Sequence, residues 1–325
     1  MTIYFFTAIF ASYTMDFNTL LLNITNPTLL FFILGVVAAI VKSDLEIPPS
    51  TTKFISYYLL LAIGFKGGQE LSHSHPNLEL FLTLFASIGI SAMIPIVIFF
   101  TLKRKVGIWN AGAIAAAYGS VSAVTFVAAT GFLESKSIEY GGHMVAAMAL
   151  MESPAIIVGV LLINLYDKDR KDKTSPIVLL KHSLTNGSVL LILGSLLIGL
   201  FSDAKQAEGI KPFTTDIFKG FLSVFLLDMG MTTARRFSSF RNSGFTLFVS
   251  AILFPLFFGS CVAYLSSFFI HSIGNRVLLS ILAASASYIA VPAALKIAVP
   301  KSDPGIYLPM ALGITFPFNI SVGLS

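Results

Sequence analysis

The stretch LAASASYIAVPAAL, residues 282–295, lies inside a long apolar run of the sequence. Apolar runs that cross a membrane tolerate helix breakers only where the freed backbone groups find new partners or line a cavity, because no water is present there. Here Ser285, Ser287, Tyr288 and Pro292 interrupt the run. We therefore expect a helix that breaks in the middle and presents hydroxyl and backbone N–H groups at the break.

The composition places this break in a membrane protein. Of the 325 residues, 55% are hydrophobic and only 11% are charged. A soluble domain carries about 25% charged residues and needs polar faces on its surface helices. The sequence therefore predicts an all-α integral membrane protein. In such a protein the net charge of +5 reports loop topology and does not indicate a nucleic-acid partner.

About ten segments are apolar enough to cross a bilayer, which takes roughly 20 residues. The second one ends in the motif IGFKGG (63–68), whose glycines predict an exit turn. We expect residues 1–24 to form an N-terminal segment, of which 1–14 are either non-native upstream sequence or a loose interfacial segment. The predicted spans are 25–42, 53–66, 78–102, 109–132, 143–166, 183–201, 213–233, 244–271, 275–298 and 305–325.

The basic residues predict how the chain is oriented. If the N-terminus lies outside, 15 of the 21 Lys and Arg residues fall in inner loops and 6 fall on the outer side. That bias agrees with the positive-inside rule. Ten spans then place both termini outside the inner (plasma) membrane, and the polar segment 167–182 becomes a cytoplasmic loop between the two halves.

The two halves carry related words in the same order. ILG (33–35) recurs at 192–194, and AAAYGSVS (115–122) resembles LAASASYI (282–289). Because five spans per half is an odd number, the second copy must be inverted in the membrane. We predict two inverted five-helix repeats, 25–166 and 183–325.

Each half contains one stretch suited to an anion. AAYGSVSAVTFVAAT (116–130) corresponds to the opening stretch, and paired interrupted helices are the best sequence indication of a transport site. Backbone N–H groups at a half-helix N-terminus, together with hydroxyls, suit a small anion. For either stretch alone, small residues that let helices pack closely are the structural alternative. The predicted anion-binding residues are Gly119, Ser120, Ser122, Thr125, Ser285 and Ser287.

Two acids lie inside apolar runs, where acids are rare and often functional. Glu152 precedes Pro154, whose ring frees a backbone carbonyl one turn back, and this predicts a cation or proton site. Asp228 is either functional or paired structurally with a neighbouring helix. Asn319 could offer its side-chain carbonyl to a cation or bond between helices. No nucleophile–base pair or zinc spacing appears, so neither an enzyme nor a metal cluster is expected.

The chain also resembles the sodium-dependent bicarbonate transporter family known from cyanobacteria, in its wider bacterial branch. The resemblance covers about 16–325. It implies core and gate domains, a homotrimer, sodium-coupled bicarbonate import and binding of a PII-like cytoplasmic regulator. The matching motifs are LEIP (45–48), IGFKGG (63–68), YGSVSAVTFVAA (118–129), LMESPAIIVGVLL (150–162), FKGFLSVFLLDMGM (218–231) and ILAASASYIAVPAALKIAVPKSDPGIYLPMALG (281–313).

By position, the resemblance puts Ser122 and Thr125 in the first substrate loop, and Ser285 and Ser287 in the second. Glu152 falls where the family pattern has aspartate. The pattern has another acid where this chain has Tyr288.

We assign Tyr288, together with Glu152 and Asn319, to the cation site. The lost acid at Tyr288 predicts a weaker sodium site, because hard cations prefer oxygen ligands that carry charge.

The sequence thus predicts a secondary active transporter of a small monovalent anion, bicarbonate first, that works by alternating access. It needs no bound cofactor, and sodium is the expected coupling ion. One alternative is a proton- or sodium-coupled carrier of small carboxylates. The other is a transport-deficient membrane sensor or scaffold of the same fold, which the altered ligands motivate.

Overall fold

A computed structural model describes residues 27–73, 77–167, 187–240, 244–288 and 290–323, with isolated positions at 177–178, 181 and 185. The predicted N-terminal segment 1–24 and most of the loop 167–182 lie outside the described residues. In the described residues all regular secondary structure is helical, which confirms the predicted all-α class.

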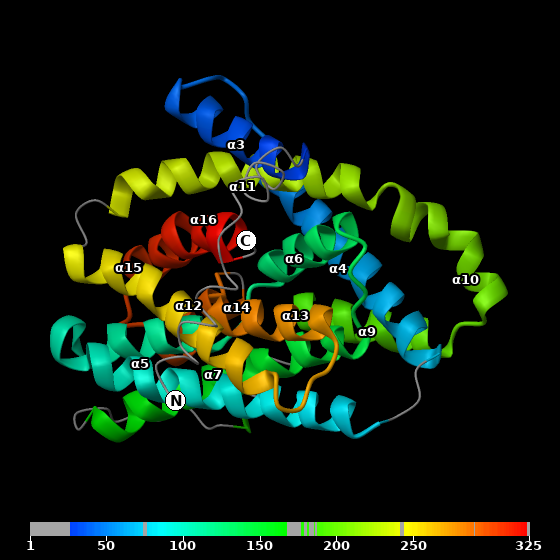
Figure 1. The fold of residues 1–325 in the computed structure, drawn as a ribbon. Helices are drawn as coiled ribbons and strands as arrows, with labels where there is room; N and C mark the ends of the chain where they lie inside the picture. The colour runs from blue at the N-terminus through cyan, green and yellow to red at the C-terminus, as the bar shows by residue number, and fades with distance from the viewer. Residues whose placement is uncertain are drawn as a thin grey trace, which may run out of the picture.

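The first half of the chain folds into five elements (Figure 1). The third is two helices in one, because Gly107 has φ +81° and ψ 165° at its middle. Few residues other than glycine adopt that backbone, so the chain turns there and the two predicted spans separate. The elements are α3 (Pro27–Ile40), α4 (Pro49–His73), α5 (Leu78–Gly119), α6 (Ala123–Ser135) and α7 (His143–Tyr166).

The second half is also helical, with more irregular backbone. Its last segment is wound partly as π-helix, a form often found near functional sites. The elements are α9 (Gly187–Phe201), α10 (Ala204–Lys211), η1 (Pro212–Asp216), α11 (Phe218–Phe240), α12 (Phe245–Ser266), α13 (Ile273–Ala284), α14 (Ala290–Ala298), α15 (Pro304–Pro309), η2 (Met310–Thr315), α16 (Phe316–Phe318) and η3 (Asn319–Gly323).

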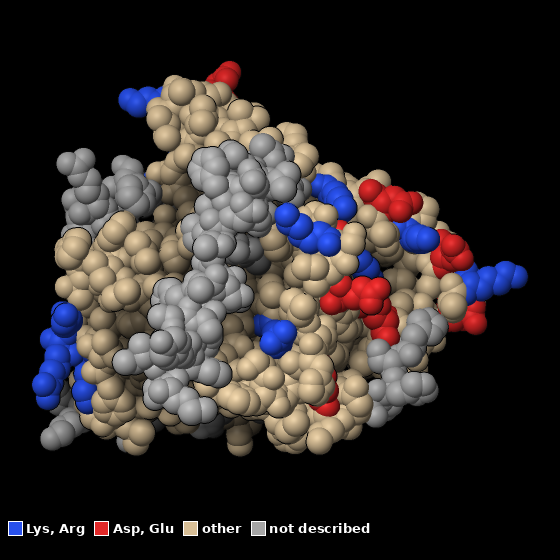
Figure 2. All heavy atoms as spheres, viewed as in Figure 1, with Lys and Arg blue, Asp and Glu red and all other residues tan. Residues whose placement is uncertain are grey.

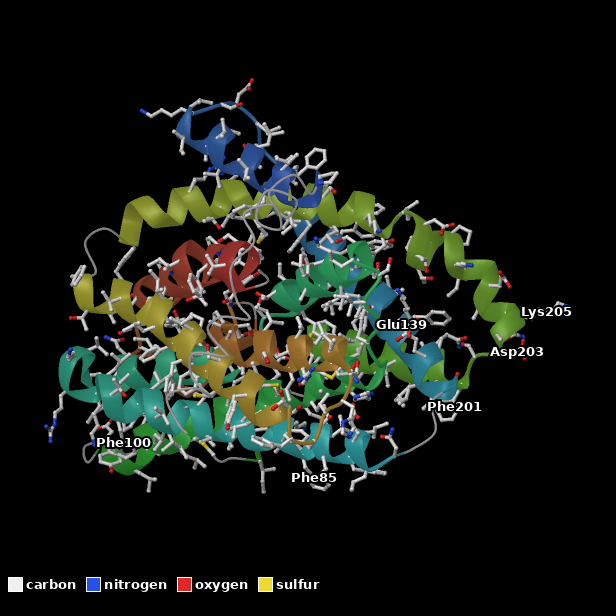
Figure 3. The ribbon with its side chains drawn as sticks, in the orientation of Figure 1. Phe85, Phe100, Glu139, Phe201, Asp203 and Lys205 are labelled. Carbon is white, nitrogen blue, oxygen red and sulfur yellow. The ribbon has the colours of Figure 1, made fainter. Side chains whose placement is uncertain are left out.

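Five helical stretches of the described chain are long and apolar enough to cross a membrane, and shorter apolar helices accompany them. Large apolar side chains such as Phe85 and Phe201 project outward from the bundle (Figure 3), and they are 72% and 82% exposed. Lipid, not water, is the solvent that such a surface fits. The chain is therefore a multi-pass membrane protein. The five long stretches are Leu78–Ser135, His143–Tyr166, Ala204–Arg235, Phe245–Ser266 and Pro304–Gly323.

Helices from the two halves pack against each other. α4 lies along α9 and α3 lies along α11, while α5 packs on α7 and α12 on α13 (Figure 1). Glycines permit these close contacts. A Cβ at Gly68 would lie 2.1 Å from the Leu196 carbonyl oxygen of α9, and one at Gly230 would lie 2.1 Å from the Phe32 carbonyl oxygen of α3.

The predicted exit turn at IGFKGG is wrong. α4 continues through Lys66 and the glycines to His73. A Cβ at Gly67 would lie 2.5 Å from a Val145 methyl group of α7, and Gly68 meets α9. The two glycines cost the helix about 1 kcal/mol each in propensity, but they allow two neighbouring helices to approach α4 closely.

The two ends of the molecule differ in charge (Figure 2). Lys103, Arg104 and Lys105 come just before the turn at Gly107 and form a basic end. The Lys103 ammonium lies 4.0 Å from the ring centre of Tyr166, a cation–π contact. Acidic and basic side chains lie together toward the opposite end, over the region where α4 and α6 finish (Figure 2).

Candidate functional site

The first interruption lies between α5 and α6. Ser120 ends α5 with extended backbone (φ −79°, ψ 174°). Ser122 caps α6, because its Oγ accepts the Thr125 N–H at 3.1 Å. One cap satisfies only one of the N–H groups that a helix start leaves unpaired. The start of α6 therefore brings polar N–H groups and the positive end of a helix dipole to the interruption.

The second interruption separates α13 from α14. Ser285 ends α13, again with extended backbone (φ −85°, ψ 168°), and its Oγ donates to the Leu282 carbonyl at 2.8 Å. Pro292 lies in the first turn of α14, where its missing N–H would have no helical partner anyway. The serines and the proline thus break the helix as the sequence predicts.

The two interruptions cross each other inside the protein. The Ser122 N–H donates to Ser285 Oγ at 3.0 Å, and the Ser287 N–H donates to the Ala117 carbonyl at 2.7 Å. Ser122 and Ser285 are 163 residues apart in the sequence and both are at most 3% exposed. Hydrogen bonds between buried groups are costly to lose, so they hold the crossing in register.

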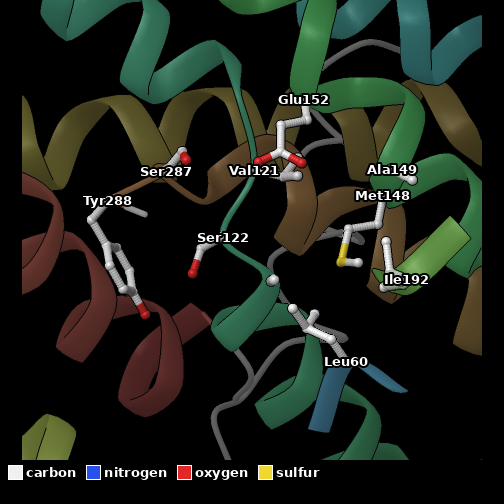
Figure 4. A pocket seen from close by; sticks show the side chains of 10 residues that line it. Leu60, Val121, Ser122, Met148, Ala149, Glu152, Ile192, Ser287 and Tyr288 are labelled. Atoms are coloured by element: carbon white, nitrogen blue, oxygen red, sulfur yellow. The ribbon is translucent and has the colours of Figure 1, made fainter. Parts of the chain in front are cut away.

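A cavity of about 30 Å³ opens beside the crossing (Figure 4). Its polar groups come from Ser122, Ser287, Tyr288 and Glu152. Figure 4 shows the loop at Val121 passing between Tyr288 on one side and Glu152 with Met148 on the other. The full lining is Leu60, Val121, Ser122, Ala123, Met148, Ala149, Glu152, Ile192, Ser287 and Tyr288.

Glu152 is the one residue with a carboxyl among the described residues of this lining. It lies on α7, two residues before Pro154. The Ser91 hydroxyl of α5 donates to the neighbouring Met151 carbonyl and fixes this part of α7. Neither of the salt bridges found in the described part of the chain involves Glu152. Its carboxyl is therefore available to a proton or a cation.

The other intramembrane acid, Asp228, has a different setting. Its Oδ2 accepts the Thr52 hydroxyl at 2.9 Å, across the contact between α11 and α4. Asp228 is not part of the cavity lining. The structural alternative, an acid bonded to a neighbouring helix, fits this geometry.

Four of the predicted site residues line the cavity, and the other five are not part of its lining. Gly119 packs so tightly that a Cβ would lie 2.3 Å from Pro95 Cγ. Ser285 and Thr125 serve the crossing and the α6 cap. Ser120 is fully buried, and its Oγ has no hydrogen-bond partner.

Asn319 holds the end of α13. Its Nδ2 donates to the Ala284 carbonyl at 2.8 Å, while its Oδ1 is buried without a partner. The Tyr288 hydroxyl is also buried without a well-aligned hydrogen-bond partner, and the Ser122 side chain is its polar neighbour. Oxygens left unpaired in this way are suited to a hard cation such as sodium.

Sequence reasoning missed the apolar part of the lining. Leu60, Met148 and Ile192 come from α4, α7 and α9, which meet only in the folded chain. Nothing in an apolar word separates a residue that faces a cavity from one that faces lipid. Only the symmetric pairing of the two broken stretches pointed to this place.

Comparison with known proteins identifies the family. The sequence matches the Na+-dependent bicarbonate transporter superfamily over residues 27–325. No curated protein sequence matches the chain. The match covers both interruptions, Glu152 and all described helices. The chain therefore belongs to the Na+-dependent bicarbonate transporter superfamily.

Proposed function

We propose that the protein is a secondary active transporter of a small monovalent anion, with bicarbonate as the substrate and sodium as the coupling ion. The observation that carries this is the crossing of two broken helices beside a cavity with hydroxyls and one carboxyl. Broken helices near the midplane are the usual place for substrates and coupling ions in secondary transporters. Family membership agrees with transport.

The order of the elements supports two inverted repeats. α3, α4 and the first part of α5 are followed by the broken pair at 120–122 and by α7. In the second half α9, α10–α11 and α12 are followed by the broken pair α13 and α14 and by the last segment. Five units in each half require an inverted second copy.

The packing of helices around the cavity supports a division into a core domain and a gate domain. Most of the cavity lining comes from the two loops, α6 and α7, which would form the core. Leu60 of α4 and Ile192 of α9 cover it from another side, and these two helices pack together as a gate would. Alternating access would then move the core past the gate.

The cavity limits the substrate. About 30 Å³ is room for roughly two water molecules, since one needs about 10–15 Å³. None of the described residues in its lining is Lys or Arg, so a weakly basic, singly charged anion fits better than a phosphate. Hydroxyls and helix-start N–H groups would bind it.

Glu152 would hold the coupling cation and offset the charge of the anion. Tyr288 would add a cation ligand from across the loop at Val121, and Asn319, which is not part of the cavity lining, would have to move toward Glu152 to join the site. A sodium ion at this place would make anion entry depend on the sodium gradient, because both ions would move with the core.

Uptake of radiolabelled bicarbonate into proteoliposomes tests this proposal. We expect saturable uptake that an inward sodium gradient accelerates and that Glu152→Gln abolishes. Uptake that ignores the gradient would remove the sodium coupling. Competition by acetate or other small carboxylates would favour the carboxylate carrier, and ligand-induced thermal stabilisation without flux would favour the sensor.

Orientation and partners belong to the same proposal. The basic end at Lys103–Lys105 would face the cytoplasm under the positive-inside rule, and both termini would lie outside the inner membrane. The homotrimer and the PII-like regulator are carried over from the family resemblance. Cross-linking in membranes and pull-down with a PII-like protein would test them.

A further inference from the structure

One face of α4 runs from the cavity to a vestibule whose lining includes Glu70, Glu134 and Glu139, called here the acidic vestibule. Leu60, Ile63, Lys66 and Glu70 follow each other at spacings of three and four residues, so they share a side of the helix. Leu60 lines the cavity beside the crossing. Lys66 lies six residues further along, which is about 9 Å at the rise of an α-helix.

Two further hollows adjoin this face. The acidic vestibule has a volume of about 590 Å³ and is open to solvent. A smaller cavity of about 10 Å³ lies next to Ala62 and Ile63. Lys66, Glu134 and Tyr140 line both of them, so these three residues form the boundary. The vestibule is lined by Lys66, Glu70, Glu134, Ser137, Ile138, Glu139, Tyr140, Gly141 and Gly142.

An ion pair closes that boundary. Lys66 Nζ lies 2.5 Å from Glu134 Oε1, and the two side chains are 33% and 27% exposed. A pair that water still reaches is weak and exchanges readily for another partner. Below it, Leu60 and Ile63 are each only 5% exposed, so apolar side chains occupy the α4 face between the small cavity and the cavity beside the crossing.

The charges around the pair make Lys66 distinctive. Among the described residues of the vestibule lining it is the only basic one, and the lining also holds Glu70, Glu134 and Glu139 (Figure 3 labels Glu139 beside α4). Burial raises the pKa of Tyr140, and the charges of Glu134 and Glu70 raise it further. Tyr140 therefore stays protonated, and its side chain already hydrogen-bonds with Glu134, so it can hold that carboxylate when Lys66 leaves it.

We propose that Lys66 admits the anion from the acidic vestibule to the transport route, with Glu134 holding it in the closed state. An arriving anion takes the place of Glu134 at Lys66, Glu134 stays bonded to Tyr140, and the boundary opens. This inference rests on the proposed function, because it assumes that the cavity beside the crossing receives an anion. It adds a specificity determinant, because Lys66 offers the anion a positive charge among the carboxylates of the vestibule.

Cysteine labelling tests the closure without any transport. In a Cys261→Ser background, Ala62→Cys places a thiol in the small cavity, where Ala62 is 1% exposed. We expect a membrane-impermeant thiol reagent to label it slowly, and several-fold faster when Glu134→Gln or Lys66→Met is added. Glu208→Gln is the matched control, because it breaks the exposed pair with Lys211 on α10. Equal labelling rates with and without the Lys66–Glu134 pair would overturn the closure.

Uptake kinetics test the role of Lys66 itself. With bicarbonate as the probe, Lys66→Met should raise KM while leaving the maximal rate close to that of the wild type, and Lys66→Arg should restore KM. A wild-type KM in Lys66→Met would overturn the proposal. Absence of bicarbonate uptake in the wild type would instead refute the proposed function, and the labelling rates would still decide whether the pair closes the route.

Discussion

At the scale of single residues, Tyr288 is the main departure from the family resemblance, which puts an acid at this position. Its hydroxyl is buried beside the cavity without a hydrogen-bond partner, while Glu152 brings the carboxyl of the lining. An acid at 288 would add a charged oxygen ligand from the second broken helix. The tyrosine adds a neutral hydroxyl, which binds a hard cation more weakly.

Replacing Tyr288 should change the ion coupling. In Tyr288→Asp we expect bicarbonate uptake to depend more steeply on sodium, because the new carboxylate adds charge to the cation site. Tyr288→Asn is the control, since it removes the ring but adds no charge. The test is bicarbonate uptake at a series of sodium concentrations. The same sodium dependence in both variants would mean that position 288 does not contact the cation.

At the scale of helices, two kinds of contact stabilise the site. Glycines bring α4 against α7 and α9, and the hydrogen bond from Ser122 to Ser285 Oγ ties the two interruptions together. The glycines hold together α4, α7 and α9, which contribute to the cavity lining, and the hydrogen bond holds together the two loops beside the cavity. Each can be tested by removing it next to a matched position that lacks the contact.

Gly68→Ala should destabilise the packing of α4 on α9. A Cβ there would lie 2.1 Å from the Leu196 carbonyl oxygen, which is backbone and cannot turn aside. Overpacking of this kind costs about 1–3 kcal/mol. Gly194→Ala on α9 is the control, because no atom lies within 4 Å of its added methyl group. The thermal unfolding temperature in detergent should fall for Gly68→Ala and stay unchanged for Gly194→Ala. An equal fall in both variants would refute the close contact.

Ser285→Ala should loosen the crossing. It leaves the buried Ser122 N–H without its acceptor, which costs about 1–3 kcal/mol. Ser280→Ala on the same helix is the control, because the Ser280 hydroxyl only bonds back to the Arg276 carbonyl at 2.7 Å. We expect Ser285→Ala to lower both thermal stability and bicarbonate uptake. Unchanged stability would show that the crossing does not need this bond.

At the scale of the whole molecule, the sequence predicted the class, the two broken helices and their pairing. It could do so because Gly119, Pro292 and the clustered serines contradict the rule that membrane spans avoid breaks. It failed at IGFKGG, because glycines that end a helix and glycines that let helices touch look alike in a sequence. It also missed Leu60, Met148 and Ile192, since only the folded chain brings their three helices to one cavity.

The central claim is that the cavity beside the crossing is where the anion binds. Ala149 lines that cavity on α7, and Ala149→Leu would fill much of its 30 Å³ with the larger side chain (Figure 4). Ala263→Leu is the matched control, because Ala263 lies on the exposed face of α12.

Uptake of radiolabelled bicarbonate into proteoliposomes should be saturable in the wild type and in Ala263→Leu, and it should be lost in Ala149→Leu. To show that both variants are folded, their thermal unfolding temperatures in detergent should match that of the wild type. Wild-type uptake by a well-folded Ala149→Leu would contradict the account, because the anion would then cross the membrane without entering this cavity.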